Sequence, residues 1–237
     1  MPLIGYWGHP PLALLQRYRR ELGQELVDLD VDMGHPETHV LPPTYCRIIR
    51  NIVDNVLALK GELSLIVASV GEEKCDQGRF AALVLRDMGF PVVETRNDKP
   101  ARRREVTIAT SDLPLREKVL RIMDTVHTPN VLRYRQCRPT VGYWGVPPHD
   151  LRLLDLFPST THVYGWTRCV EAGCPADLEE EMAADEGVPT VFFSQVFCAK
   201  QQLAKYLAEK HGGLYVDADG QITTSLAARV EAFIRFA

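Results

Sequence analysis

Three motifs that mark common nucleotide-binding and hydrolytic folds are missing from this sequence of 237 residues. It contains no Gly-x-Gly-x-x-Gly fingerprint, no phosphate-binding loop ending in Gly-Lys-Ser/Thr and no Gly-x-Ser-x-Gly nucleophile elbow. These absences argue against a nicotinamide-dependent dehydrogenase, a P-loop nucleotide hydrolase and an α/β-hydrolase.

Long apolar runs and a strong charge imbalance are missing as well. No run approaches the ~18 apolar residues of a membrane-spanning helix, so we expect no membrane segment. The start of the chain lacks the basic and apolar regions of a signal peptide, which predicts a cytoplasmic protein. A net charge of −4 gives no general attraction to nucleic acid.

The six cysteines include no Cys-x-x-Cys pair, which argues against a zinc ribbon and a thioredoxin-type motif. In a cytoplasmic protein we expect them to be reduced thiols or metal ligands. The sequence positions of the cysteines are 46, 75, 137, 169, 174 and 198.

One heptapeptide occurs twice. Gly-Tyr-Trp-Gly-His-Pro-Pro at 5–11 returns as Gly-Tyr-Trp-Gly-Val-Pro-Pro at 142–148, with six of seven positions identical. Apolar residues precede each copy and a Leu-rich stretch follows, which indicates a strand, a tight aromatic turn and a helix. The repeat predicts two similar halves of about 100 residues each.

Alternation of strand and helix patterns fills both halves and predicts an α/β fold with a parallel sheet in each. Such halves are flavodoxin-like or Rossmann-like, and we expect them to face each other across a cleft. The predicted division is a first domain at 1–97, a basic linker with a connecting helix at 98–137, and a second domain at 138–237. In these sheets, ligands bind outside the carboxyl ends of the strands. The predicted strands are 3–7, 25–30, 63–70 and 91–95, then 140–144, 161–164, 190–194 and 214–216. The predicted helices are 10–22, 44–59, 78–88, 114–126, 148–157, 175–186, 197–211 and 222–236.

Four cysteines lie near the carboxyl ends of the predicted strands, where ligands are expected to bind. Cys75, Cys169 and Cys198 each follow a predicted strand, and Cys46 opens a predicted helix. Thiolates select iron–sulfur clusters, zinc or copper(I), so the four are candidate metal ligands. The alternative is that they are small buried apolar residues, as free cysteines commonly are.

The order of these segments resembles a known family. The first match is Thr44-Tyr45-Cys46 opening a helix, then the apolar strand 63–70 and Cys75-Asp76 before another helix. The second is the closing segment 193–237, which runs from Phe193 and Cys198 through a helix and a strand to Gly220-Gln221 and a final helix. With Cys169 after a strand, the chain resembles the cysteine-rich subunits of 2-hydroxyacyl-CoA dehydratases and benzoyl-CoA reductases.

The resemblance implies a [4Fe–4S] cluster between two flavodoxin-like domains, in subunits that reduce or dehydrate CoA thioesters by one-electron chemistry. It implies Cys46, Cys75 and Cys169 as ligands, with Cys198 as an alternate or fourth. The chain departs from the family in two ways. It has Tyr6, Trp7 and His9 where relatives have a cysteine, and only about 40 residues join its domains. CoA binding in the family's manner is therefore in doubt.

The paired aromatic loops are candidates for walls of such a site. Tyr6, Trp7, Tyr143 and Trp144 would exclude water around a cofactor or, alternatively, simply pack the contact between the two domains. His9 and His149 follow the loops and are candidate metal or substrate ligands. An arginine cluster in the linker suits a CoA or phosphate group, or is a solvated surface. Its members are Arg102, Arg103, Arg104, Arg133, Arg135 and Arg138.

Two classes of function follow. The first is an iron–sulfur protein of low-potential electron transfer, or a reductase or dehydratase component, working with a protein redox partner or a dimerising subunit. The second is a non-enzymatic accessory module that holds a small ligand or metallocofactor for a partner enzyme. A zinc site built from Cys and His is a weaker alternative. The residues identify no catalytic side chain and no substrate.

Overall fold

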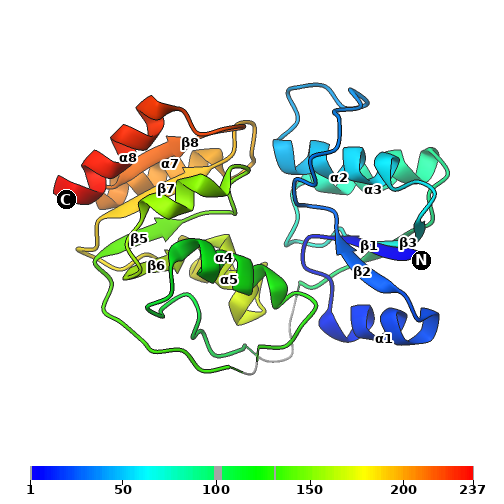
Figure 1. The fold of residues 1–237 in the computed structure, drawn as a ribbon, viewed down its shortest axis with the longest axis horizontal. Coiled ribbons are helices and arrows are strands. Elements are labelled where there is room, and N and C mark those ends of the chain that lie inside the picture. Colours follow the sequence, from blue (N-terminus) through cyan, green and yellow to red (C-terminus); the bar gives the residue numbers. More distant parts are fainter. Residues whose placement is uncertain (1, 99–102, 131, 237) are drawn as a thin grey trace. The chain divides into compact units, whose positions relative to one another are not determined.

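The computed structural model describes residues 2–98, 103–130 and 132–236, and it divides the chain into two compact units. Unit 1 comprises residues 1–100 and 126–128, and unit 2 comprises 101–125 and 129–237. Both units are drawn in Figure 1. Within the described residues, no helix combines the length and the apolar character that a membrane crossing requires.

Unit 1 is a parallel sheet of four strands in the order β2-β1-β3-β4. Helix α1 lies on one side of this sheet, and α2 and α3 lie on the other (Figure 1). The elements in chain order are β1 (Leu3–Trp7), α1 (Leu12–Leu22), β2 (Glu25–Asp28), α2 (Arg47–Ala58), β3 (Leu63–Ser69), α3 (Asp76–Asp87) and β4 (Val92–Thr95).

Unit 2 has the same architecture, a parallel sheet in the order β6-β5-β7-β8. Its elements are α4 (Leu115–Asp124), β5 (Val141–Trp144), the 3₁₀ helix η1 (Leu151–Leu156), β6 (Thr161–Tyr164), α5 (Trp166–Ala172), α6 (Leu178–Met182), β7 (Thr190–Ser194), α7 (Gln201–His211), β8 (Leu214–Asp217) and α8 (Thr224–Phe236). The prediction of an α/β fold in two halves, each with a parallel sheet, is confirmed.

The internal repeat extends from the heptapeptide to the sheet register. The Gly-Tyr-Trp segment lies in β1 in unit 1 and in β5 in unit 2, and each of these strands is second in the spatial order of its sheet. In unit 1, Tyr6 pairs with Asp28 on one side, and Trp7 pairs with Ala68 on the other. In unit 2, Tyr143 pairs with Val163 and Trp144 with Phe192. Each residue around β1 therefore has a counterpart around β5.

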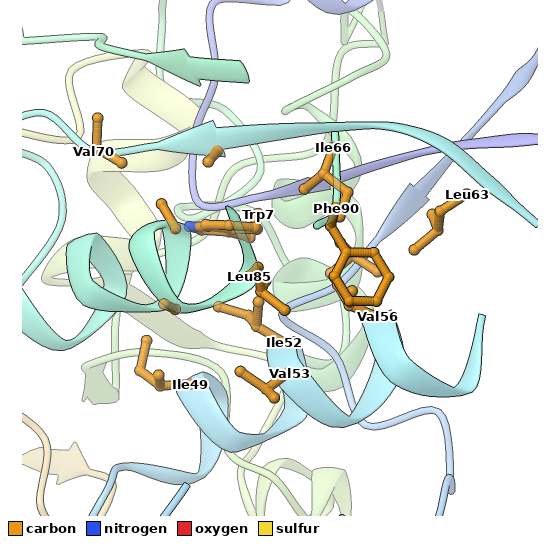
Figure 2. Close-up of a cluster of buried hydrophobic side chains, with 14 of the residues drawn as sticks. Trp7, Ile49, Ile52, Val53, Val56, Leu63, Ile66, Val70, Leu85 and Phe90 are labelled. Atoms are coloured by element: carbon orange, nitrogen blue, oxygen red, sulfur yellow. The ribbon is translucent and has the colours of Figure 1, made fainter. Parts of the chain in front are cut away.

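Adjacent residues of a strand point to opposite faces of its sheet, so each Tyr-Trp pair covers both faces. Trp7 is fully buried in the core between the sheet and helices α2 and α3, as Figure 2 shows. Helix α2 contributes Ile49, Ile52 and Val56 to this core, which follows the 3.6-residue period expected of a helix with one buried face. Burial of these side chains is the main source of stability in unit 1.

Three helices of unit 2 differ from the pattern-based prediction. The helix predicted near 148–157 is the short 3₁₀ helix η1, and the one predicted at 175–186 is reduced to α6. Helix α5 was not predicted. It begins directly after β6, because Gly165 alone turns the chain with φ 71° and ψ −154°. A change of direction at one glycine has no polar capping residue to mark it.

The segment predicted as a linker with a connecting helix is largely part of unit 2. Residues 101–125 belong to unit 2, and α4 contacts α5, η1 and β6. The Glu171 carboxylate accepts hydrogen bonds from the backbone N–H groups of Thr107, Ile108 and Ala109, at 2.7, 2.6 and 2.9 Å. This buried carboxylate ties residues 107–109 to α5.

Candidate functional site

The carboxyl ends of β1, β2 and β3 meet at one edge of the unit 1 sheet. In this strand order, the chain leaves β1 toward β2 on one side and later returns to form β3 on the other. This reversal between β1 and β3 is the place where open parallel α/β sheets bind ligands. The residues that follow β1 and β3 are therefore the first candidates for a site.

A buried charged cluster lies at this edge. Lys74 Nζ donates to Asp30 Oδ1 at 3.1 Å, and both side chains are about nine-tenths buried. The other oxygen of Asp30 accepts a hydrogen bond from the Gly8 backbone N–H. The Asp30 N–H in turn donates to Asp28 Oδ1 at 2.9 Å. The cluster is therefore held together by hydrogen bonds to side chains and backbone.

Two pKa values at this edge are displaced from their usual range. Burial, followed by the charge of Asp30, raises the pKa of Asp28 to about 7. Burial opposes the charge of Lys74, but its pKa is nevertheless raised, because the Asp30 carboxylate and the thiols of Cys75 and Cys46 favour the ammonium. The site therefore holds one permanent cation and one carboxyl group that titrates near neutral pH.

A buried hydroxyl group lies at the same edge. Ser69, the last residue of β3, is 0% exposed, and within the described part of the chain its Oγ has no hydrogen-bond partner. A Cβ added to Gly8 would lie 2.8 Å from Ser69 Cβ and 3.4 Å from Lys74 Nζ. Gly8, with φ 72°, therefore packs closely against Ser69 and Lys74, and a larger residue would not fit without a shift.

Cys46 and Cys75 occupy equivalent positions on neighbouring helices. Cys46 is the N-cap of α2 and Cys75 is the N-cap of α3. The Cys46 N–H donates to Gln77 Oε1 at 3.0 Å, which links the first turns of the two helices. Helix N-termini carry a partial positive charge that stabilises thiolate sulfur. The two predicted ligands of unit 1 are thus brought to one positively charged edge.

Cys169 and Cys174 form a second pair, in unit 2. Cys169 lies in α5 and is 0% exposed, and Cys174 follows the end of that helix and is 6% exposed. The Cys169 thiol donates to Asp177 O at 3.8 Å, and the Cys174 N–H donates to Cys169 O at 3.0 Å. Interaction with the Cys174 sulfur, together with burial, raises the pKa of Cys169. The same interaction, with Arg103 opposing the effect of burial, lowers the pKa of Cys174 to about 7.

The remaining cysteines lie apart from these pairs in the sequence. Cys198 follows β7 in a turn closed by its N–H donating to Gln195 O at 3.0 Å. The Cys137 thiol donates to Ser111 O at 3.1 Å, a structural contact. Across residues 2–98, 103–130 and 132–236, no three His, Cys, Asp or Glu side chains form a group that could hold a metal ion. A shared site for Cys46, Cys75, Cys169 and Cys198 stays a prediction.

The four aromatic candidates lie in the interiors of their units. Trp144 Nε1 donates to Glu181 O at 2.6 Å, and the Tyr143 hydroxyl donates to Val146 O at 2.7 Å. The Tyr6 hydroxyl hydrogen-bonds to His127 Nδ1 at 3.0 Å. Trp7 contributes to the core drawn in Figure 2. These contacts show that the four side chains pack within their own units, whereas the predicted alternative was packing between the domains.

The histidine and arginine candidates make contacts within their own units. His9 is buried, and its Nδ1 lies 2.7 Å from Asn97 Nδ2, whereas His149 is partly exposed. Arg103 pairs with Glu180, and Arg104 Nη2 donates to Val170 O at 2.8 Å. These two arginines therefore stabilise unit 2. Arg102 lies outside the described residues.

Sequence reasoning missed the most polar part of the site. Asp28, Asp30, Ser69 and Lys74 were not among its candidates. A weak signal was present, since Asp28 and Asp30 lie at the carboxyl end of the predicted strand 25–30, at the predicted binding edge. The contact of Lys74 with Asp30, 44 positions away, could not be foreseen from spacing.

Comparisons with known proteins give no relative. No protein-family model and no curated protein sequence matches the chain. One solved structure retrieved is the thioesterase RedJ from the prodiginine biosynthetic pathway of Streptomyces coelicolor. It is 12% identical over 98% of this chain and 90% of that chain, with a TM-score of 0.25. At this TM-score the likeness carries no argument about fold or activity.

Proposed function

We propose that this chain is an iron–sulfur protein of low-potential electron transfer, in which Cys46 and Cys75 are cluster ligands. The proposal rests on one observation. Both cysteines are N-cap residues of neighbouring helices, α2 and α3, and they interact electrostatically with the same buried ammonium group, that of Lys74. The resemblance to the cysteine-rich dehydratase and reductase subunits is the reason to name a [4Fe–4S] cluster.

The donor chemistry of this edge fits such a group. Thiolates are the usual ligands of iron–sulfur clusters, and the net charge of a thiolate-ligated cluster is negative. Two helix N-termini and the Lys74 ammonium would offset that charge, while Asp30 holds the lysine in place. When bound, the cluster would supply one-electron transfer. The part played by Gln77 would be to orient Cys46 through its backbone N–H.

Two thiols do not complete a cluster, which takes four ligands. The resemblance implies Cys169 and Cys198 for the remaining positions, and this part of the proposal is open to direct test.

Anaerobic reconstitution with iron and sulfide tests the proposal. We expect a brown protein with broad visible absorption and an EPR signal after reduction. Cys46→Ser and Cys75→Ser should each lose most of the bound iron, whereas Cys137→Ser, at a thiol that only contacts backbone carbonyls, should retain it. Cys169→Ser and Cys198→Ser show whether these residues complete the ligand set.

A colourless wild-type protein that takes up no iron under these conditions would rule the proposal out. Elemental analysis of the freshly purified protein separates iron from zinc. If zinc is found in place of iron, the zinc alternative replaces the iron–sulfur proposal.

A second candidate is a non-enzymatic module that binds a small anionic ligand for a partner protein. The observation in its favour is the buried Ser69 hydroxyl, which has no hydrogen-bond partner among the described residues; Ser69 packs against Gly8, as Lys74 does. Calorimetric titration with CoA and with inorganic phosphate tests this candidate. We expect Ser69→Ala to weaken binding, and Ser64→Ala, at a surface serine of the same strand, to leave it unchanged. Failure of both ligands to bind would count against it.

A further inference from the structure

The end of helix α5 has a specific backbone geometry. The Gly173 N–H donates to Val170 O at 3.0 Å, and the Cys174 N–H donates to Cys169 O at 3.0 Å. Gly173 adopts the left-handed conformation, with φ 70°. This pair of hydrogen bonds around a left-handed glycine is a Schellman motif, one of the common ways in which helices end.

A Schellman motif brings two side chains together. Of its two hydrogen bonds, one joins residues that are five positions apart in the sequence. The side chains of those two residues normally make an apolar contact that seals the helix end. In this chain both of these residues are cysteines, Cys169 and Cys174, and their backbones share this 3.0 Å hydrogen bond. The contact arises from the fold of the helix end itself, so it does not depend on a distant part of the chain.

We propose that Cys169 and Cys174 are a redox-active dithiol. The two thiols form a reversible disulfide with each other by exchange with a low-molecular-weight disulfide, such as oxidised glutathione. A backbone hydrogen bond between the two residues keeps their Cα atoms within the range that a disulfide spans. The surrounding charges suit the reaction. The guanidinium groups of Arg103 and Arg104 interact with the Cys174 sulfur, while the Asp177 carboxylate opposes them.

The order of the two steps follows from burial. Cys174 is 6% exposed and Cys169 is 0% exposed, so Cys174 is the sulfur that meets the oxidant. Its thiolate attacks one sulfur of oxidised glutathione, which forms a mixed disulfide and releases one glutathione thiolate. Cys169 then gives up its proton and attacks the Cys174 sulfur, which releases the second glutathione. Two protein thiols are oxidised and one glutathione disulfide is reduced to two thiols.

Arg103, whose side chain is 50% exposed, lies near the thiol pair and forms an ion pair with Glu180. Oxidised glutathione is a direct probe of the pair, because the proposed exchange needs only a low-molecular-weight disulfide. The proposal does not affect the assignment of Cys46 and Cys75, but a Cys169 that belongs to the dithiol is not the cluster ligand that the resemblance implies at this position.

The test uses the whole chain, fully reduced and then incubated anaerobically with oxidised glutathione. Remaining thiols are alkylated at set times, and peptides are mapped by mass spectrometry. We expect a Cys169–Cys174 disulfide to form before any other protein disulfide, while Cys137 in the same unit remains alkylated. Glutathione in its reduced form should reverse the reaction.

Variants separate the two steps. Cys169→Ser should stop at a stable mixed disulfide on Cys174, and Cys174→Ser should leave Cys169 unmodified. Gly173→Ala should slow disulfide formation by about tenfold, because other residues adopt the left-handed conformation with difficulty. Gly212→Ala, at the left-handed end of α7 where no side chain is near, is the matched control and should react at the wild-type rate.

The measurement on the wild-type chain decides the matter even if a variant does not fold. Recovery of both residues as alkylated thiols after prolonged exposure to oxidised glutathione would overturn the proposal. So would oxidation of Cys137 at the same rate. Iron content measured on the same samples reports separately on Cys46 and Cys75, so failure of one proposal is distinguishable from failure of the other.

Discussion

The two units share one frame but differ at the edge where ligands are expected. Asp28 in unit 1 corresponds to Val163 in unit 2, because each pairs with the tyrosine of the repeat. The residue after Ala68 is Ser69, and the residue after its counterpart Phe192 is Phe193. A carboxyl group and a hydroxyl group in unit 1 are thus replaced by two apolar side chains in unit 2.

This difference indicates which copy of the repeat carries the polar chemistry. In unit 2, Tyr143 stacks on Phe193 with ring centroids 6.1 Å apart and meets Phe157 edge-on at 5.7 Å, so aromatic rings fill the space. In unit 1, the same level holds charged groups that need one another to remain buried. The same arrangement of strands therefore supports aromatic packing in unit 2 and a polar site in unit 1.

Substitution of the repeat's tryptophans should give the largest change in the free energy of unfolding in either unit. Trp7→Ala and Trp144→Ala should each lower the free energy of unfolding by about 3–5 kcal/mol, because each removes a fully buried ring. The loss at Trp144 should be larger by about 1 kcal/mol, since its indole also donates to Glu181 O. Urea unfolding with hydrogen exchange of peptides from each unit measures both values. A larger loss at Trp7 would contradict this account.

The pH dependence of stability should differ between the units. Because the folded pKa of Asp28 is raised to about 7, native unit 1 binds more protons than its unfolded chain between about pH 4 and pH 7. Its stability should therefore fall as the pH rises through this window, by on the order of 2–4 kcal/mol. Asp28→Asn should remove this fall. Hydrogen exchange as a function of pH checks it, with unit 2, which has Val163 there, as the internal reference.

The second glycines of the two loops should respond unequally to alanine. Both have positive φ, 72° at Gly8 and 148° at Gly145. A Cβ at Gly145 would lie 2.3 Å from the backbone oxygen of Phe193, whereas at Gly8 the closest atom is Ser69 Cβ at 2.8 Å. We expect losses of about 2–3 kcal/mol for Gly145→Ala and about 1–2 kcal/mol for Gly8→Ala. Thermal unfolding measures them. Gly23→Ala, with open space around it, gives the cost of the backbone conformation alone.

The tyrosines of the repeat should show the smallest difference. Tyr143→Phe leaves the buried Val146 O without its 2.7 Å hydrogen bond and should cost about 1 kcal/mol. Tyr6→Phe loses a partly buried hydrogen bond to His127 and should cost less. Chemical denaturation of both variants provides the comparison. An equal or larger cost at Tyr6 would mean that its hydroxyl is as tightly coupled to the core as that of Tyr143.

The positions of the strands could be predicted from the sequence, because short apolar runs bounded by glycine and proline usually form strands. The sequence predicted β1, β6 and β7 to the residue. It also placed Cys46 at the opening of a helix, since helix signals are local, and Cys75 in the loop between a strand and a helix. It missed the pairing of Lys74 with Asp30 and the contact between Cys169 and Cys174. The first depends on how separate segments pack together, and the second follows from an unpredicted helix that begins after Gly165.

The Glu171 carboxylate sets an order of events during synthesis of the chain. The N–H groups of Thr107, Ile108 and Ala109 leave the ribosome long before their acceptor, which is 62 residues further along in the case of Ala109. At about 5–20 residues per second, that interval lasts about 3–12 s. The strands and helices of unit 1 precede this segment and can begin to fold in the meantime. Unit 1 is therefore nearly complete when residues 107–109, which lie near the start of unit 2, have been synthesised but their acceptor Glu171 has not.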